Sequence, residues 1–433
     1  MIKSLKVDNT LNYMIVIYAF LIPISRSGIA VFSISLLLVW FFSDDFKLKV
    51  KYLIDNKITL YLIIFFTLSF ISIAWSDDIS GGLYYFRKYI YVVPLFVIAT
   101  SLDKKYIPYL ISAFLFGMLI SEIFSYGIFF ELFQYKKILP SNPTPFMHHI
   151  PYSMFLAFSS LLILNKIFFV KSVNIKIILS LYFLIILVNL FINSGRTGQV
   201  AFILTLFIIF FLNIKDKFIA LLSIAIFTIS ILFISYNNSP IFKNRVDNAL
   251  VESNKILKDE YCTSWGRRAG GWIVAKDIFL DNPIIGTGLS YDMVYLKRYI
   301  DNNKDIFSNY NQNSKCVRTL YHYHNYYIQT AVRLGLVGFI IFMLIFYYIF
   351  KLDIKDREIK NILIIFISIF MISNLFDNLF HSQFGESLFA LFIGLFIAQY
   401  RIENIGTGTL VLALGEAKAI TSDELLKKSN AKN

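Results

Sequence analysis

Long apolar runs separated by short polar stretches dominate the chain. Twelve runs approach the roughly 20 residues that cross a bilayer as a helix, and they lie near 11–24, 28–42, 58–74, 89–100, 106–130, 150–169, 177–192, 199–212, 218–236, 326–350, 361–375 and 386–400. The runs 11–24 and 89–100 are short, so a helix built on either of them spans a bilayer only if it includes flanking polar residues. The pattern predicts nine membrane helices, a long polar loop over 237–323, and three more helices.

The composition indicates an all-α, polytopic membrane protein. Hydrophobic residues make up 57% of the chain and aromatic residues 18%, including 45 Phe and 27 Tyr. A soluble domain would not bury so many apolar side chains among so few charges. A transporter of the major-facilitator type would also have twelve helices, but its halves meet at a cytoplasmic loop after the sixth helix. Here the long insertion follows the ninth predicted helix.

Lys and Arg are distributed unevenly between the two sets of alternating loops. One set together with the two termini holds 22 of them, and the short loops of the other set hold 6. Because positive residues stay on the cytoplasmic side, both termini are predicted to be cytoplasmic and the loop 237–323 external. The net charge of +13 then lies mainly against anionic membrane lipids. Since the basic residues are spread over loops, we expect no nucleic-acid partner.

Four regions follow from this pattern. Residues 1–236 hold helices one to nine, and 237–325 form a partly helical external domain. Residues 326–405 hold the last three helices, and 406–433 form a cytoplasmic tail or an appended segment without a recognisable motif.

Both cysteines, Cys262 and Cys316, fall in the external loop. An oxidising compartment favours a disulfide between them, and the alternative is two free thiols.

Arg196 lies in the segment 193–198, Asn-Ser-Gly-Arg-Thr-Gly, between the seventh and eighth predicted helices. Glycines let the backbone turn, and a new helix N-terminus offers unpaired N–H groups to an anion. A guanidinium there can bind phosphate through two parallel hydrogen bonds. The alternative is an interfacial arginine that reaches toward lipid headgroups.

Arg267 and Arg268 open a predicted helix over 268–280 in the external loop. Arg268 precedes Trp272 by one helical turn, so the indole could support its guanidinium. Two arginines in a loop are otherwise most often a solvated surface.

His324 is the candidate general base, because an imidazole can accept a proton near neutral pH. Asn325 follows it and could orient a sugar or the imidazole, and His322 lies two residues earlier. Gly335 is 11 residues from His324, close to three turns, so one helix would carry both on one face. Gly335 and Gly338 would let a second helix approach closely. The alternative is a histidine in an interfacial aromatic belt, since tyrosines surround it.

The segment His-Asn, nine residues, then Gly-Leu-Val-Gly resembles the His-(Asn/Ser/Gln)-nine-residue-Gly-x-x-Gly signature of bacterial O-antigen ligases. The contexts of Arg196 and Arg268 also resemble that family. The resemblance implies a multi-pass enzyme of the Gram-negative inner membrane with a periplasmic active site. It implies transfer of a glycan from undecaprenyl pyrophosphate to the lipid A core oligosaccharide, without a metal or another cofactor. Polymerases and protein O-oligosaccharyltransferases of the same superfamily remain alternatives.

The resemblance implies that Arg196 and Arg268 stabilise the departing pyrophosphate while His324 acts as the base for the acceptor hydroxyl. Arg87 would add charge for the pyrophosphate. Arg333 would border the substrates or pair with Glu122, which is costly inside a membrane helix. A transporter or flippase of anionic lipid-linked glycans would also place arginines in an outer cavity, but it would not need the His324 arrangement.

Three further histidines, His148, His149 and His381, carry weaker signals. His148 and His149 lack nearby carboxylates and suit no common metal site, so we expect no metal there. His381, in the last external loop, is expected to line the same chamber as His324.

Overall fold

The computed structural model describes residues 2–43, 45–290 and 293–404, and this part of the chain is all-α. The predicted tail 406–433 lies outside the described residues. In chain order the helices are α1 (Ile2–Leu21), α2 (Arg26–Phe41), α3 (Phe46–Asp55), α4 (Lys57–Ile71), α5 (Ile79–Phe86), α6 (Pro94–Ser101), α7 (Ile107–Phe129), α8 (His149–Phe169), α9 (Val173–Ile192), α10 (Arg196–Asn213), α11 (Lys217–Asn238), α12 (Pro240–Ile256), α13 (Ser264–Asp281), α14 (Val294–Asn302), α15 (Tyr310–Val317), α16 (Tyr326–Phe350), α17 (Arg357–Phe376) and α18 (Gln383–Asn404).

Within the described ranges, nine helices are long and apolar enough to cross a membrane, or ten if the bent pair α2 and α3 is one span. This is fewer than the twelve predicted. The run 89–100 is divided between a 3-10 turn and the short α6, because Pro94 lacks an N–H and starts a new helix. The run 11–24 belongs to α1, whose first half carries Lys6 and Asp8. The prediction of a polytopic membrane protein is confirmed at this coarser level.

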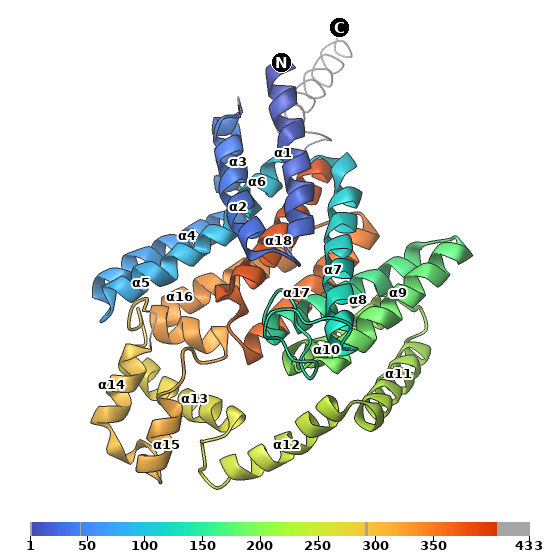
Figure 1. Cartoon of the computed structure of the whole chain (residues 1–433). Coiled ribbons are helices and arrows are strands. Elements are labelled where there is room, and N and C mark those ends of the chain that lie inside the picture. Colours follow the sequence, from blue (N-terminus) through green and yellow to red (C-terminus); the bar gives the residue numbers. More distant parts are fainter. Residues whose placement is uncertain (1, 44, 291–292, 405–433) are drawn as a thin grey trace.

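The N-terminus and the helices α12–α15 lie at opposite ends of the molecule (Figure 1). That arrangement agrees with an N-terminus and a long loop on opposite sides of the membrane. Which compartment each side faces stays a prediction.

Helix α18 forms the centre of the bundle and is buried on nearly all sides. It packs against α6 and α17, and Gly394 lies where a side chain would meet Ile98 of α6. Residues 388–398 in its middle are wholly apolar, as expected in such an enclosed position, and its buried Glu386, Gln399 and Arg401 lie toward its two ends. The polar ends of the bundle, rather than its centre, therefore hold the candidate chemistry.

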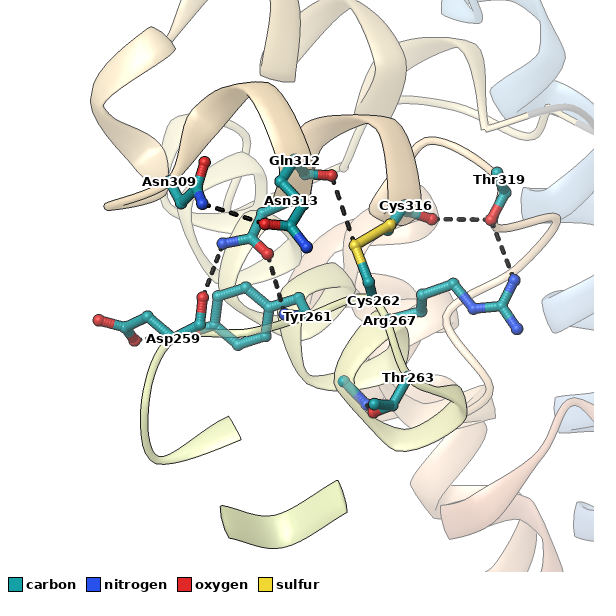
Figure 2. Close-up of a disulfide and its surroundings, with 11 residues drawn as sticks. Asp259, Tyr261, Cys262, Thr263, Arg267, Asn309, Gln312, Asn313, Cys316 and Thr319 are labelled. Carbon is teal, nitrogen blue, oxygen red and sulfur yellow. Dashed lines mark hydrogen bonds between the residues drawn. A yellow bond between two sulfur atoms is a disulfide. The ribbon is translucent and has the colours of Figure 1, made fainter. Parts of the chain in front are cut away.

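Helices α13–α15 form a second, smaller core outside the bundle. Its buried side chains include Val274, Ile278, Leu296, Val317 and Leu320. A disulfide joins Cys262 to Cys316, and the Asn313 side chain bonds the backbone of residues 259 and 261 beside it (Figure 2). These links hold the start of α13 against α15.

Helix α16 is broken at Gly335, where φ is 64° and ψ is −165°. The segment 283–288 lies in the break: Leu336 N donates to Pro283 O at 2.8 Å, and Gly288 N donates to Arg333 O at 2.9 Å. The predicted helix–helix contact at Gly335 is therefore wrong, because its close neighbour is the Ile284 carbonyl of this segment. At Gly338 the nearest atoms belong to Leu334 of the same helix.

We expect Gly335→Ala to destabilise the protein by more than about 2 kcal/mol, because this backbone conformation is nearly restricted to glycine. The added Cβ would also lie 2.2 Å from Ile284 O. Thermal unfolding in detergent measures the loss, and limited proteolysis should show new cleavage near 283–288. Gly28→Ala, at a helical position with only side-chain neighbours, is the control. Equal stability of the two variants would contradict this account.

Cys262 and Cys316 should be disulfide-bonded in protein isolated from the cell envelope. The bond closes a loop with a sequence separation of 54 residues, which stabilises the fold by about 4 kcal/mol on the chain-entropy account. Thiol alkylation followed by mass spectrometry measures it. Labelling of both cysteines without prior reduction would contradict the prediction.

Candidate active site

His324 lies just before α16 and not within it. Asn325 is the N-cap: its Oδ1 accepts hydrogen bonds from Tyr327 N and Ile328 N, both at 3.0 Å. His324 itself has a φ of 50°, which no α-helix allows. The prediction of one continuous helix through His324 and Gly335 is therefore wrong at both positions, although the spacing still brings the segment to the mouth of α16.

Tyr323 fixes the backbone beside His324 from two sides. Its carbonyl accepts a hydrogen bond from Trp272 Nε1 at 2.7 Å, and its N–H donates to Gln329 Oε1 at 3.1 Å. The external helix α13 thereby positions the histidine segment directly.

Asp377, immediately after α17, is the site residue that the sequence analysis missed. Its Oδ1 lies 3.3 Å from His324 Nδ1 and 3.7 Å from His322 Nε2. The same oxygen accepts a hydrogen bond from Asn378 N at 2.8 Å. Burial opposes ionisation of this carboxyl, but the two imidazoles and the amide lower its pKa to about 2. Asp377 is therefore an anion at neutral pH.

The two imidazoles have different hydrogen-bonding states. Burial lowers the pKa of His322 to about 3, so its ring is neutral at physiological pH. Its Nδ1 accepts from the backbone N–H of His324 at 3.1 Å, which leaves the proton on Nε2, toward Asp377. The His324 Nδ1 contact with Asp377 is within ion-pair distance but is not aligned as a hydrogen bond. A proton on that Nδ1 leaves Nε2 of His324 as the basic nitrogen.

The same three side chains could hold a metal ion. His322, His324 and Asp377 each offer one ligand atom, and these atoms lie within 4.8 Å of one another. Two histidines and a carboxylate are a donor set known from catalytic zinc sites. The prediction of a metal-free site is therefore a point for experiment.

Arg268 reaches the same place from α13. Its Nη1 donates to the carbonyl of Phe376, the residue before Asp377, at 2.8 Å. Its guanidinium lies 5.7 Å from the ring centroid of Trp265, and not beside Trp272 as predicted. The expectation was wrong because the Trp272 indole is bound to the backbone of Tyr323.

Arg196 begins α10 and shares a cavity of about 400 Å³ with Arg268. A third arginine, Arg245 of α12, lines the same cavity and was not among the predicted residues. Arg196 Nη1 is buried without a hydrogen-bond partner in the described part of the chain. The cavity therefore presents guanidinium donors to an anion.

A larger cavity of about 1020 Å³ borders the histidine cluster. Arg26, Arg87 and Lys88 line it, as do His322 and Asp377. Arg87 is thus apart from Arg196 and Arg268, contrary to the expectation that it joins them.

Residues that are adjacent in the sequence line different cavities. His148 and Asp377 line the larger one, whereas His149 and Phe376 line the smaller one. His381 also lines the larger cavity, stacked on Tyr85 and 3.1 Å from Lys88 Nζ. His322 and Asp377 of the cluster therefore line the larger cavity, and Phe376, next to Asp377, lines the smaller one.

Two of the predicted arginines lie outside both cavities. Arg267 is exposed and donates to Thr319 Oγ1 at 3.3 Å. Arg333 is buried over the ring of Tyr85, 4.2 Å from its centroid. The suggested pairing of Arg333 with Glu122 is wrong, because no described residue forms a hydrogen bond or ion pair with the Glu122 carboxylate.

Comparison with known proteins gives one family match. No curated protein matches the chain significantly. Residues 181–343 match the protein family described as O-Antigen ligase. The matched region runs from α9 into α16 and includes Arg196, Arg268 and His324. This polytopic membrane protein therefore carries a domain of the O-antigen ligase family.

Proposed function

We propose that the protein is an O-antigen ligase, which transfers a glycan from undecaprenyl pyrophosphate to the lipid A core oligosaccharide at the periplasmic face of the inner membrane. The observation that carries this proposal is the position of His324. Its Nδ1 contacts Asp377, which lines the larger cavity, and the preceding residue, Phe376, lines the cavity that contains the arginines.

In this mechanism the donor pyrophosphate occupies the smaller cavity, where Arg196 and Arg268 bind its oxygens. The acceptor enters from the larger cavity, whose wall includes Arg26, Arg87 and Lys88 as well as apolar side chains such as Phe66 and Phe96. Such a lining suits an anionic amphiphile. Both substrates then meet at the wall that carries the histidine cluster.

The chemical step is a single displacement. Nε2 of His324 takes the proton of the acceptor hydroxyl as its oxygen forms a bond to the anomeric carbon. The bond from that carbon to the pyrophosphate oxygen breaks, and the electron pair leaves with the pyrophosphate. Attack from the opposite face inverts the anomeric configuration. The arginines stabilise the charge that develops on the leaving group, and no nucleotide is required.

Incubation of purified protein with lipid-linked glycan and lipid A core tests the proposal. Glycan transfer to the core without ATP supports the ligase. Elongation of the lipid-linked glycan would identify a polymerase instead, and the absence of both products would favour a transporter. A reaction with EDTA tests whether the histidine cluster holds a catalytic metal. A metal-free mechanism predicts that transfer is unchanged after chelation, whereas a catalytic metal predicts that transfer is lost.

His324→Ala should abolish transfer while the protein stays folded, because the side chain serves as a base and not as a packing element. Asp377→Asn should lower kcat by about 10²–10⁴, since the amide no longer holds a proton on Nδ1 of His324. KM for both substrates should change little. Asp353→Asn, at an exposed carboxylate, is the matched control. Wild-type kcat in either site variant would refute the role assigned to that residue.

Arg196→Ala and Arg268→Ala should each reduce use of the donor about tenfold to a hundredfold, because a charge-assisted hydrogen bond contributes roughly 1.5–3 kcal/mol. Lys should restore Arg196 only in part, since an ammonium lacks the two-pronged geometry. Transfer is measured against donor and acceptor concentration separately. Arg267→Ala removes a neighbouring exposed arginine and should have little effect. A raised acceptor requirement with unchanged donor dependence would show that the arginine concerned is misassigned.

A further inference from the structure

Arg245 of α12 is the third guanidinium of the smaller cavity. We propose that Arg245 binds the pyrophosphate of the donor and neutralises the charge that appears when the glycosidic bond breaks. This inference rests on the proposed transfer reaction and adds a pyrophosphate-binding residue to it.

The side of α12 that faces the cavity has a regular helical spacing. Arg245, Ala249, Ser253 and Ile256 line the cavity at intervals of three or four residues, which places them on one face of the helix. Lys255, on the same helix, is exposed and does not line it. Arg245 is thus the cation that α12 directs into this space.

One end of α12 contacts α9, which ends shortly before Arg196, and the other end contacts α13, which carries Arg268. Near its start, Ser239 Oγ donates to Phe191 O at 3.2 Å, and the Phe242 ring packs on the Phe191 ring at the end of α9, shortly before Arg196. Near its other end, Glu252 Oε2 accepts from Trp265 N at 3.0 Å, at the start of α13. Figure 1 shows α12 running between α11 and α13. These contacts hold α12 against the cavity that Arg196 and Arg268 also line.

The lining of the cavity carries three cations and, among its described residues, no carboxylate. Arg196, Arg245 and Arg268 line it. The carboxylates of Glu252 and Asp377 attract Arg268, and Glu252 also attracts Arg196, but both carboxylates lie outside the lining. Like charges in a small, partly desolvated space repel, so an anionic ligand is needed to offset them. The partnerless Nη1 of Arg196 indicates the same kind of ligand.

The number of arginines matches the chemistry of the leaving group. A glycan linked through pyrophosphate to a lipid carries two ionised phosphate oxygens. When the anomeric carbon–oxygen bond breaks, the bridging oxygen keeps the electron pair and becomes a third anionic oxygen. Two guanidiniums balance the bound donor, whereas three balance the transition state and product. Arg245 is therefore expected to act more strongly on kcat than on donor affinity.

The test compares Arg245→Ala, Arg245→Lys and the control Lys255→Ala in purified protein. Lys255→Ala removes the same charge from the same helix but outside the cavity. We expect Arg245→Ala to lower kcat about tenfold to a hundredfold, Arg245→Lys to recover part of the loss, and Lys255→Ala to match the wild type. Binding of inorganic pyrophosphate, measured by calorimetry in detergent, should weaken in Arg245→Ala but not in Lys255→Ala.

Failure of this inference is distinguishable from failure of the proposed function. If the wild type transfers glycan and Arg245→Ala has wild-type kcat and pyrophosphate affinity, Arg245 has no such role while the ligase proposal stands. If the wild type transfers nothing, the ligase proposal fails, and the pyrophosphate arm still decides whether Arg245 binds this anion. Equal losses in Arg245→Ala and Lys255→Ala would show a general charge effect and would overturn the assignment.

Discussion

The break in α16 at Gly335 is the constraint on which the rest of the site depends. A broken helix at membrane depth leaves backbone N–H and C=O groups without partners, and such groups are tolerated only when protein satisfies them. Here the segment 283–288 supplies those partners, with bonds to residues 332, 333, 336 and 337. This segment directly follows α13, so the membrane bundle and the external helices are joined through paired backbone at that point.

This backbone pairing helps to bring three distant parts of the chain together at His324: α13, the end of α17 and the segment before α16. α13 carries Arg268, whose guanidinium binds the carbonyl of Phe376 at the end of α17. The same helix carries Trp272, which holds the backbone of Tyr323 next to His324. Asp377 then follows Phe376 and contacts His324. Each contact is modest by itself, but together they fix Arg268 and His324 on either side of the Phe376–Asp377 segment.

The sequence predicted the helices of this arrangement better than the contacts between them. Hydrophobic patterning located the spans and the external loop, because membrane helices have a strong and local signal. The contexts of Arg196, Arg268 and His324 were distinctive in the same local way. Asp377 was missed because an Asp-Asn pair after a helix is equally typical of a turn, and only the fold brings it to His324.

One further residue was missed, and one predicted helix was wrong. Arg245 is one of many cations in a polar loop, and its direction depends on where α12 is attached at Phe191 and Trp265. The spacing of His324 and Gly335 suggested one helix, whereas the Asn325 cap and the positive φ at Gly335 interrupt it. The cap is a local signal that the spacing alone does not contain. The break at Gly335, in contrast, depends on the segment 283–288, far away in the sequence.

The backbone of His324, with a φ of 50°, lies in the left-handed region, which glycine occupies freely and other residues only uncommonly. A side chain held there costs about 1–2 kcal/mol of folding free energy. The imidazole that we propose as the base is thus placed at the expense of stability, a trade-off seen at active sites in general. Under the proposed mechanism, a glycine at this position would give a more stable but inactive protein, so selection for thermal resistance alone would tend to remove the base.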